Sequence, residues 1–275
     1  MTALPNKLIE MKNLLENAII EDGKRGKESL IRSSKLINLL HEAVKEDLVS
    51  NGVDRRLIIP PVGQSSPEMK IAGFLKSKKQ DICIVPKNVT RTPRNIDWGP
   101  SAVEEAMDEH GSEFTKHTLV INVRSQLSSI CKNTDTLFER TFAEPLNLRL
   151  VYKDLIMGEV YLIPLYEYEE GVMDENRVMF KTRHTNVEKY ISFFLEVSGR
   201  DGPEDALYMY EVCALLIVDF KHDPPKLYQT SKELVDDGII CRSFPLDLYD
   251  ISYEKFIKTL LDKYDERFGV ERLKD

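Results

Sequence analysis

Acidic and basic side chains stand beside apolar runs at several points of the chain, where a folded core would fix their positions. Asp81 begins the run DICIV, and Asn122 and Arg124 alternate at the end of LVINVRS. Glu139 and Glu144 follow in TDTLFERTFAEPLNL. Carboxylates together with water are the ligands that Mg²⁺ prefers, and a nearby cation stabilises negative charge. These residues are therefore the first candidates for chemistry.

The charge of the chain is divided by segment. The formal net charge of -8 argues against a nucleic-acid partner, because attraction to phosphates comes from positive surface. Between Lys70 and Arg94, however, seven basic residues stand against the single acid Asp81, whereas residues 97–113 carry six acids and no Lys or Arg. The basic segment is therefore a candidate phosphate-binding surface.

Apolar spacing predicts the elements that must position these residues. Helical periodicity indicates helices around 8–19, 36–48 and 253–268, the second ended by Asn51 and Gly52. Short β-branched runs predict strands in 57–63, 70–79, 80–86 and 117–125, and VCALLIV predicts a central strand covered on both faces. Pro145 is expected to break or kink the helix that carries Glu139 and Glu144.

The order of these elements predicts an α/β protein with a mixed central sheet flanked by helices. We expect a single domain over 1–275, with N-terminal helices in 1–52, a core in 57–220 and a C-terminal helical part in 230–275. No repeat or linker divides the chain.

Missing motifs exclude several classes of protein. The sequence has no Walker A motif, no G-x-G-x-x-G after a strand and no G-x-S-x-G, so a nucleotide cofactor and serine-hydrolase chemistry have no support. The longest apolar run is too short to span a membrane. Cys83, Cys131, Cys213 and Cys241 lie far apart and are expected to be reduced core residues, so we expect a cytoplasmic protein.

The order of elements around Asp81 resembles the PD-(D/E)xK nuclease superfamily, and the type II restriction endonucleases in particular. In that superfamily a helix and two strands place an Asp beside a Glu and a Lys from the next strand. Where the superfamily has E-x-K, this chain has Asn122-Val123-Arg124. One branch, which cuts sites with a CCGG core, has S-x-K there and takes its Glu from the following helix, and the segment E-P-L-N-L at 144–148 resembles that part.

The resemblance implies a Mg²⁺-dependent enzyme that hydrolyses double-stranded DNA at a short site, with Asp81 and a helix Glu as metal ligands. Glu144 is favoured by the E-P-L-N-L segment, and Glu139 by its shorter spacing from Arg124. The catalytic cation is Arg124 or Lys132, and Glu42 corresponds to a second-metal residue on the preceding helix.

The resemblance also implies a DNA-binding surface. Phosphate and base contacts are expected from the basic segment and from the Arg/Ser-rich stretch after the strand. The residues are Lys78, Lys79, Arg124, Ser125, Gln126, Ser128 and Ser129. A palindromic target read by two symmetric copies implies a homodimer.

Each residue also has a structural interpretation. Asp81 would protect a strand edge, Arg124 would pair with a neighbouring acid, and Glu42 and Glu139 would be solvent-facing helix charges. The absent acid of E-x-K favours a rival function, a non-catalytic nuclease-like DNA-binding subunit. A repair nuclease that selects DNA structure is a third possibility.

Overall fold

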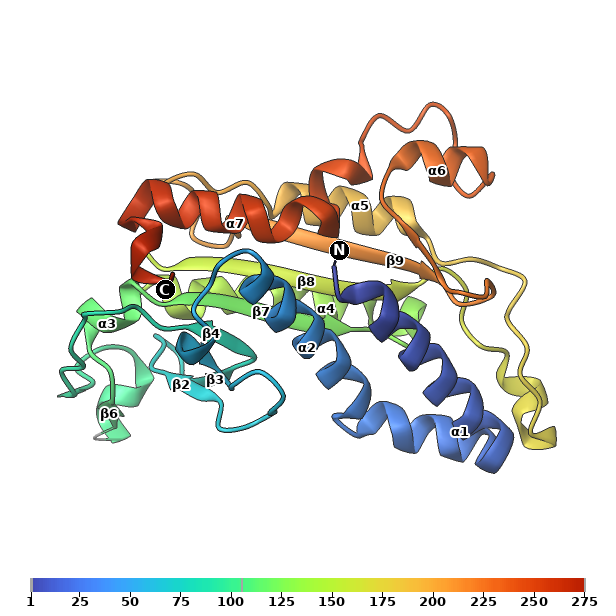
Figure 1. Cartoon of the computed structure of the whole chain (residues 1–275), viewed down its shortest axis with the longest axis horizontal. Helices are drawn as coiled ribbons and strands as arrows, with labels where there is room; N and C mark the ends of the chain where they lie inside the picture. Colours follow the sequence, from blue (N-terminus) through green and yellow to red (C-terminus); the bar gives the residue numbers. More distant parts are fainter. Residues whose placement is uncertain (1, 105, 275) are drawn as a thin grey trace.

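The computed structural model describes residues 2–104 and 106–274 and has the predicted α/β architecture, with helices on both sides of a mixed sheet (Figure 1). The helices are α1 (Leu4–Arg32), α2 (Lys35–Ser50), α3 (Ser112–Lys116), α4 (Ile130–Arg149), α5 (Val187–Glu196), α6 (Ser231–Asp236) and α7 (Tyr253–Phe268). Short 3-10 turns are η1 (Arg55–Leu57), η2 (Pro100–Glu104), η3 (Glu170–Glu175), η4 (Leu248–Ile251) and η5 (Val270–Arg272). The strands are β1 (Ile58–Ile59), β2 (Met69–Ile71), β3 (Lys78–Gln80), β4 (Ile82–Ile84), β5 (Arg94–Asn95), β6 (Met107–Asp108), β7 (Leu119–Ser125), β8 (Ile156–Pro164), β9 (Val212–Asp219) and β10 (Lys226–Tyr228).

The central sheet has six strands in the order β1-β4-β7-β8-β9-β10. The pairs β1/β4, β4/β7 and β9/β10 are antiparallel, whereas β7, β8 and β9 run parallel. A parallel neighbour requires a long crossover, and α4 supplies it between β7 and β8. The sheet therefore has a parallel centre, β7-β8-β9, with antiparallel strands on both sides of it.

Two apolar clusters cover the two faces of the sheet. On one face, α1, α2 and α7 pack against odd-numbered β7 residues such as Ile121 and Val123. On the other, α4 and α5 pack against Val120, Tyr161 and Cys213. Figure 1 shows α2 and α7 in front of the strands and α4 behind them. The N-terminal helices expected from the sequence thus form part of the main core.

Helix α4 continues through Pro145, so the expected break is absent. A proline inside a helix leaves the carbonyl four residues earlier without its N–H partner. That carbonyl belongs to Thr141, and it accepts a hydrogen bond of 2.9 Å from the hydroxyl of buried Tyr210. Because this side chain satisfies the carbonyl, Glu144 keeps a helical position on α4.

Several expectations are confirmed and others need correction. The predicted helix over 253–268 is α7, which ends at Gly269, and the predicted central strand is β9, buried along its whole length. Cys83 and Cys213 are buried as expected, but Cys131 and Cys241 are exposed. Among the described residues, no helix combines the length and the apolar character needed to span a membrane.

Candidate functional site

Three polar residues form a row across the middle of the sheet. The register that pairs Ile82 with Ile121 brings Asp81, at the start of β4, level with Asn122 of β7. Asn122 in turn pairs with Glu159 of β8. Adjacent strands lie about 4.8 Å apart and register partners share a face, so the two acids flank the amide on the α4 side of the sheet.

The two acids in this row are held differently. Oδ2 of Asp81 accepts a hydrogen bond of 2.9 Å from the backbone N–H of Val123, and the side chain remains partly exposed. Glu159 is fully buried, and burial raises the pKa of its carboxyl to about 7. The neighbouring Arg124 opposes that rise and the charge of Asp81 adds to it.

Arg124 lies over the row and joins the sheet to α4. Its Nη1 donates to Oε1 of Glu159 at 2.5 Å and to Oγ1 of Thr141 at 3.2 Å, while Nη2 pairs with Glu144. Burial lowers the pKa of the guanidinium, but Glu159 and the other acceptors outweigh it, so the pKa is above its usual value. Arg124 is therefore a fixed positive charge.

Glu144 receives two cations. One carboxylate oxygen contacts Nη2 of Arg124 and the other contacts Nζ of Lys78 on β3. Arg140, one turn earlier on α4, lies 4.0 Å from the same carboxylate. The predicted residues Asp81, Arg124, Glu144 and Lys78 thus come together in the folded chain.

These residues face a hollow of about 300 Å³. Asp81, Lys78, Arg124, Ser125 and Arg140 give it a polar lining, and apolar side chains from α1, α2, α4 and β8 close its sides. A smaller hollow of about 210 Å³, lined by Lys76, Lys78, Arg140 and Glu144 among others, lies next to it along α4. Both cavities are bordered by more cations than acids, which suits an anionic ligand.

The donor set can be tested against a Mg²⁺ ion. Among the residues that the structure describes, no group of three or more His, Cys, Asp or Glu side chains gathers as a metal site. Mg²⁺ is commonly held by one or two carboxylates with water in the other positions. Asp81 fits this requirement, because its Oδ1 makes no hydrogen bond or ion pair to any described residue. Glu144 fits it only after Lys78 and Arg124 release its oxygens.

Three predicted residues lie away from the hollow or are already engaged. Lys132 and Glu139 are exposed on α4, and Lys132 lines a different cavity with Ser129 and Glu167. Lys132 and Glu139 therefore point away from the α4 face that carries Glu144, and neither takes part in the contacts around Arg124. Glu42 contacts Lys45, and its other oxygen accepts a 2.6 Å hydrogen bond from the backbone N–H of Gly63. Glu42 therefore anchors the loop after β1.

The stretch expected to read bases is only partly accessible. Ser125 lines the hollow, and Ser128 and Ser129 line a neighbouring cavity. Gln126 is buried: its Oε1 accepts from the hydroxyls of Tyr190 at 2.6 Å and Tyr161 at 3.3 Å, and its Nε2 donates to Ile130. The geometry gives Gln126 a role inside the core and does not direct its amide to a base edge.

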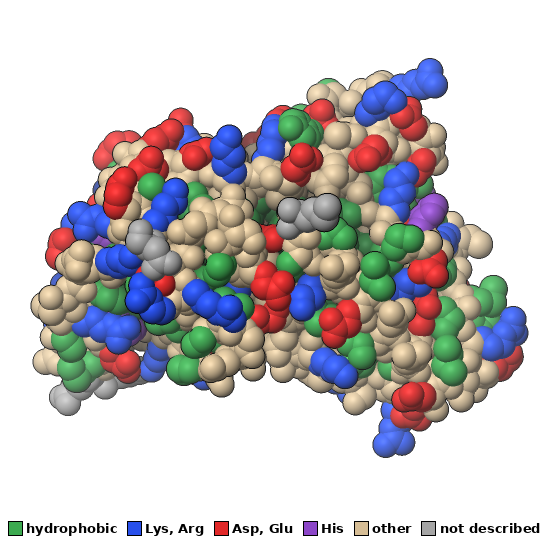
Figure 2. All heavy atoms as spheres, viewed as in Figure 1, with side chains coloured by type: hydrophobic (Ala, Val, Ile, Leu, Met, Phe, Trp, Pro, Cys, Tyr) green, Lys and Arg blue, Asp and Glu red, His purple; other side chains and the backbone are tan. Residues whose placement is uncertain are grey.

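Much of the basic segment is balanced locally. Figure 2 shows Lys and Arg side chains gathered on the left of one face, over β2, β4 and α3, and acidic side chains near its centre, over α2. Several of the segment's cations have acidic partners from outside it. Lys79 pairs with Glu68 at 3.5 Å, Lys87 with Asp54 at 3.5 Å and Arg94 with Asp108 at 3.5 Å. Exposed Lys70 and Lys76 have no such ion pair among the described residues.

Sequence reasoning missed four residues of this site. Glu159 and Thr141 hold Arg124, and Tyr210 supports the turn of α4 that carries Glu144. His41 on α2 has a buried Nε2 without a hydrogen-bond partner, and burial lowers its pKa while the nearby charge of Asp81 acts in the opposite direction. A Glu inside a buried strand was the only sequence signal that pointed to Glu159.

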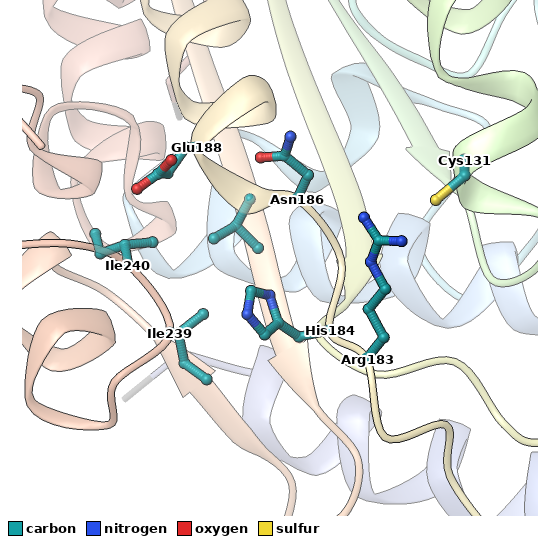
Figure 3. Close-up of a pocket in the computed structure, with 8 residues that line it drawn as sticks. Cys131, Arg183, His184, Asn186, Glu188, Ile239 and Ile240 are labelled. Carbon is teal, nitrogen blue, oxygen red and sulfur yellow. The ribbon is translucent and has the colours of Figure 1, made fainter.

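A further cavity, of about 330 Å³, lies outside this group. Figure 3 shows Ile239 and Ile240 on one side, Cys131 across from them, and Arg183 and His184 between. None of the acids in the row across the sheet lines it.

Comparisons with protein-family models, with curated proteins and with solved structures gave no significant match.

Proposed function

We propose that this protein is a Mg²⁺-dependent endonuclease of the restriction type, which hydrolyses phosphodiester bonds of double-stranded DNA at a specific short site. The observation that carries the proposal is that Asp81, Arg124 and Lys78 line one hollow, with Glu144 paired to both of these cations. Acids for a metal and cations for a phosphate are the groups that metal-assisted hydrolysis requires.

The chain's own residues have distinct parts in this proposal. Asp81 would hold the metal, with water in the remaining positions and Glu144 as the second carboxylate once its cations turn to the DNA. When bound, the ion would supply an activated water and neutralise charge on the phosphate. Arg124 and Lys78 would stabilise the charge that grows on the scissile phosphate. Thr141 and Glu159 keep Arg124 in place.

DNA binding would use the cations that border the two hollows and the exposed lysines of the basic segment. Lys76, Lys78 and Arg140 line the adjoining cavity, and Ser125 faces the first one. Phosphate contacts of this kind release counterions, so DNA affinity should fall steeply with salt, with a slope of about -0.9 per phosphate contacted. An affinity that does not change with salt would remove the DNA-binding part of the proposal.

Oligomeric state and location complete the proposal. Symmetric reading of a palindromic site requires a homodimer, which light scattering of the DNA complex would detect. A cytoplasmic location is proposed from the four cysteines, all of which are unpaired thiols in the structure.

One observation favours the rival function, a nuclease-like DNA-binding subunit without catalysis. Both oxygens of Glu144 are engaged by Arg124 and Lys78, so protein cations stand where a metal would contact this carboxylate. A permanent ion pair of this kind would keep the fold and a phosphate-binding surface while leaving Asp81 as the single free acid.

Incubation with long, unmethylated bacteriophage DNA and Mg²⁺ or Mn²⁺ separates the two functions. An endonuclease of the restriction type gives discrete fragments that disappear with EDTA. DNA binding by gel shift without any cleavage would support the non-catalytic subunit and contradict the proposal.

Asp81→Ala tests the metal ligand: it should retain DNA binding and lose cleavage. Asp135→Ala removes an exposed acid paired with Lys189 and serves as the matched control.

A further inference from the structure

Asn122 occupies the central position between two acids, although it carries no charge itself. Asn122 and Glu159 are register partners, and Asp81 stands on the other side of Asn122. Both Asn122 and Glu159 are buried, and each has one polar atom without a hydrogen-bond partner: Nδ2 of Asn122 and Oε2 of Glu159. The acid that faces Arg124 from the sheet therefore comes from β8.

Glu159 is the buried end of a series of contacts that leads through Arg124 to Glu144 on α4. It pairs with Nη1 of Arg124, and Nη2 of Arg124 pairs with Glu144 on α4. The other hydrogen-bonding groups at this guanidinium are the hydroxyls of Thr141 and Tyr210. Of the two described acids in direct contact with Arg124, Glu159 is fully buried and Glu144 is half-buried.

We infer that Glu159 is a positioning residue of this site: it supplies from β8 the acid that β7 lacks at Asn122, and it fixes the direction in which Arg124 faces the hollow. This inference rests on the proposed function for the consequence of misplacing Arg124. The fixed direction itself follows from the contacts of Glu159 alone.

Charge is what makes this role specific. A carboxylate accepts a strong, short hydrogen bond from a guanidinium and opposes its positive charge, whereas an amide of the same shape does neither to the same degree. The titratable and charged groups around Glu159 are Arg124, Asp81, Tyr161, Tyr210 and Cys213. Arg124 is the only cation among them, so loss of the Glu159 charge releases Arg124 toward Glu144 and the solvent.

The test compares Glu159→Gln with Glu211→Gln, which alters another buried, arginine-paired carboxylate, directly before β9. Phenylglyoxal modifies accessible arginine side chains, and mass spectrometry measures its rate at Arg124 without DNA or metal. Glu159→Gln should make Arg124 react several-fold faster. It should also lower the cleavage rate at saturating DNA by about 10- to 100-fold with little change in KM, because a displaced group of this kind loses its effect on the reaction.

A relocated acid provides the second measurement. The double variant Asn122→Asp with Glu159→Gln returns one acid to the row beside Arg124, and it should regain the slow phenylglyoxal reaction and part of the cleavage rate. This variant is also measured if Glu159→Gln alone does not fold. Glu211→Gln should leave both Arg124 readouts at the wild-type level in the folded protein.

The inference would be overturned if Glu159→Gln left both Arg124 reactivity and cleavage unchanged. It would also be overturned if Asn122→Asp with Glu159→Gln protected Arg124 no better than Asn122→Ala with Glu159→Gln, which has an acid at neither position. Because phenylglyoxal reactivity needs neither DNA nor metal, it remains decisive when the wild-type chain cleaves nothing. Absence of wild-type cleavage therefore counts against the proposed function alone.

Discussion

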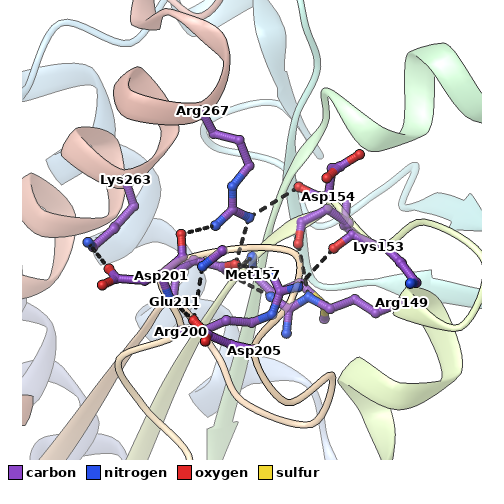
Figure 4. A network of polar contacts seen from close by, with 12 residues as sticks. Arg149, Lys153, Asp154, Met157, Arg200, Asp201, Asp205, Glu211, Lys263 and Arg267 are labelled. Atoms are coloured by element: carbon purple, nitrogen blue, oxygen red, sulfur yellow. Dashed lines mark hydrogen bonds and ion pairs between the residues drawn. The ribbon is translucent and has the colours of Figure 1, made fainter.

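Two buried carboxylates, one on β8 and one directly before β9, bind arginines in very different ways. Figure 4 shows Glu211, next to the start of β9, within a group of three arginines. Oε1 accepts from Arg200 and Arg267 at 2.9 Å each, and Oε2 accepts from Arg149 and from the backbone N–H of Met157. Glu159 on β8 has one arginine, and its Oε2 has no hydrogen-bond partner.

The difference lies in the two carboxylates: both oxygens of Glu211 accept hydrogen bonds, whereas Oε2 of Glu159 accepts none, and the unpartnered buried atom of the Glu211 group is a donor, Nε of Arg200. Arg149 and Arg200 are fully buried, and half-buried Arg267 bonds α7 to the backbone of Asp201, so the group around Glu211 joins distant segments. The group around Glu159 opens through Arg124 onto a hollow. A buried polar atom without a partner is costly, and a catalytic role, a bound ion or a water molecule can account for it.

The largest expected effect is on stability, at Glu211. Glu211→Ala leaves three arginines without their shared acceptor and should lower the free energy of unfolding by about 3–5 kcal/mol. Urea denaturation measures this. Glu159→Ala frees a single arginine that keeps its contact with Glu144 and should cost clearly less, so equal losses in the two variants would erase the distinction.

Gln126→Ala should come next in size. The amide carbonyl accepts from two buried tyrosine hydroxyls, which would be left without a partner, so we expect a loss of about 1–3 kcal/mol in stability. Cleavage of cognate and near-cognate sites by the folded variant should change equally. A selective change in site preference would show instead that Gln126 reaches a base.

Tyr210→Phe removes one hydroxyl and should cost about 1 kcal/mol, because the carbonyl of Thr141 then lacks a donor that Pro145 cannot replace. Hydrogen exchange should show a loosened turn around Glu144. Exchange that is unchanged across α4 would show that the Tyr210 hydroxyl does not support this helix.

The last stability prediction is the part of the pH dependence that Glu159 contributes. Its folded-state pKa of about 7 lies above the unfolded value, so the folded chain binds the extra proton and this contribution to stability falls as pH rises from about 4.5 to about 7. Glu159→Gln should flatten that decline across this pH range, because the amide does not titrate. Identical pH profiles for wild type and variant would mean that Glu159 is ionised throughout.

Local patterns predicted the elements well because they depend on neighbouring residues. Helical spacing indicated α7 and its end at Gly269, and a continuous apolar run indicated β9. The continuity of α4 could not be predicted, since it depends on a hydroxyl from Tyr210, distant in sequence.

The site was predicted only in part for the same reason. Asp81, Arg124, Glu144 and Lys78 do come together. Glu139, predicted from its spacing to Arg124, and Lys132, the alternative cation, are instead exposed on α4. Glu159 reaches Arg124 through the register of two parallel strands, and no local pattern contains that information.

The most direct test of the account is single-turnover DNA cleavage with Mg²⁺, measured side by side for Asp81→Asn and Glu211→Gln and scaled to the folded fraction of each protein. Asp81→Asn should be slower than wild type by about a thousandfold, about 4 kcal/mol in the barrier, since the metal loses its ligand. Glu211→Gln should cleave at the wild-type rate once folded. Cleavage by Asp81→Asn at the wild-type rate, or an equal loss in both variants, would contradict the assignment of the catalytic site to Asp81 and its hollow.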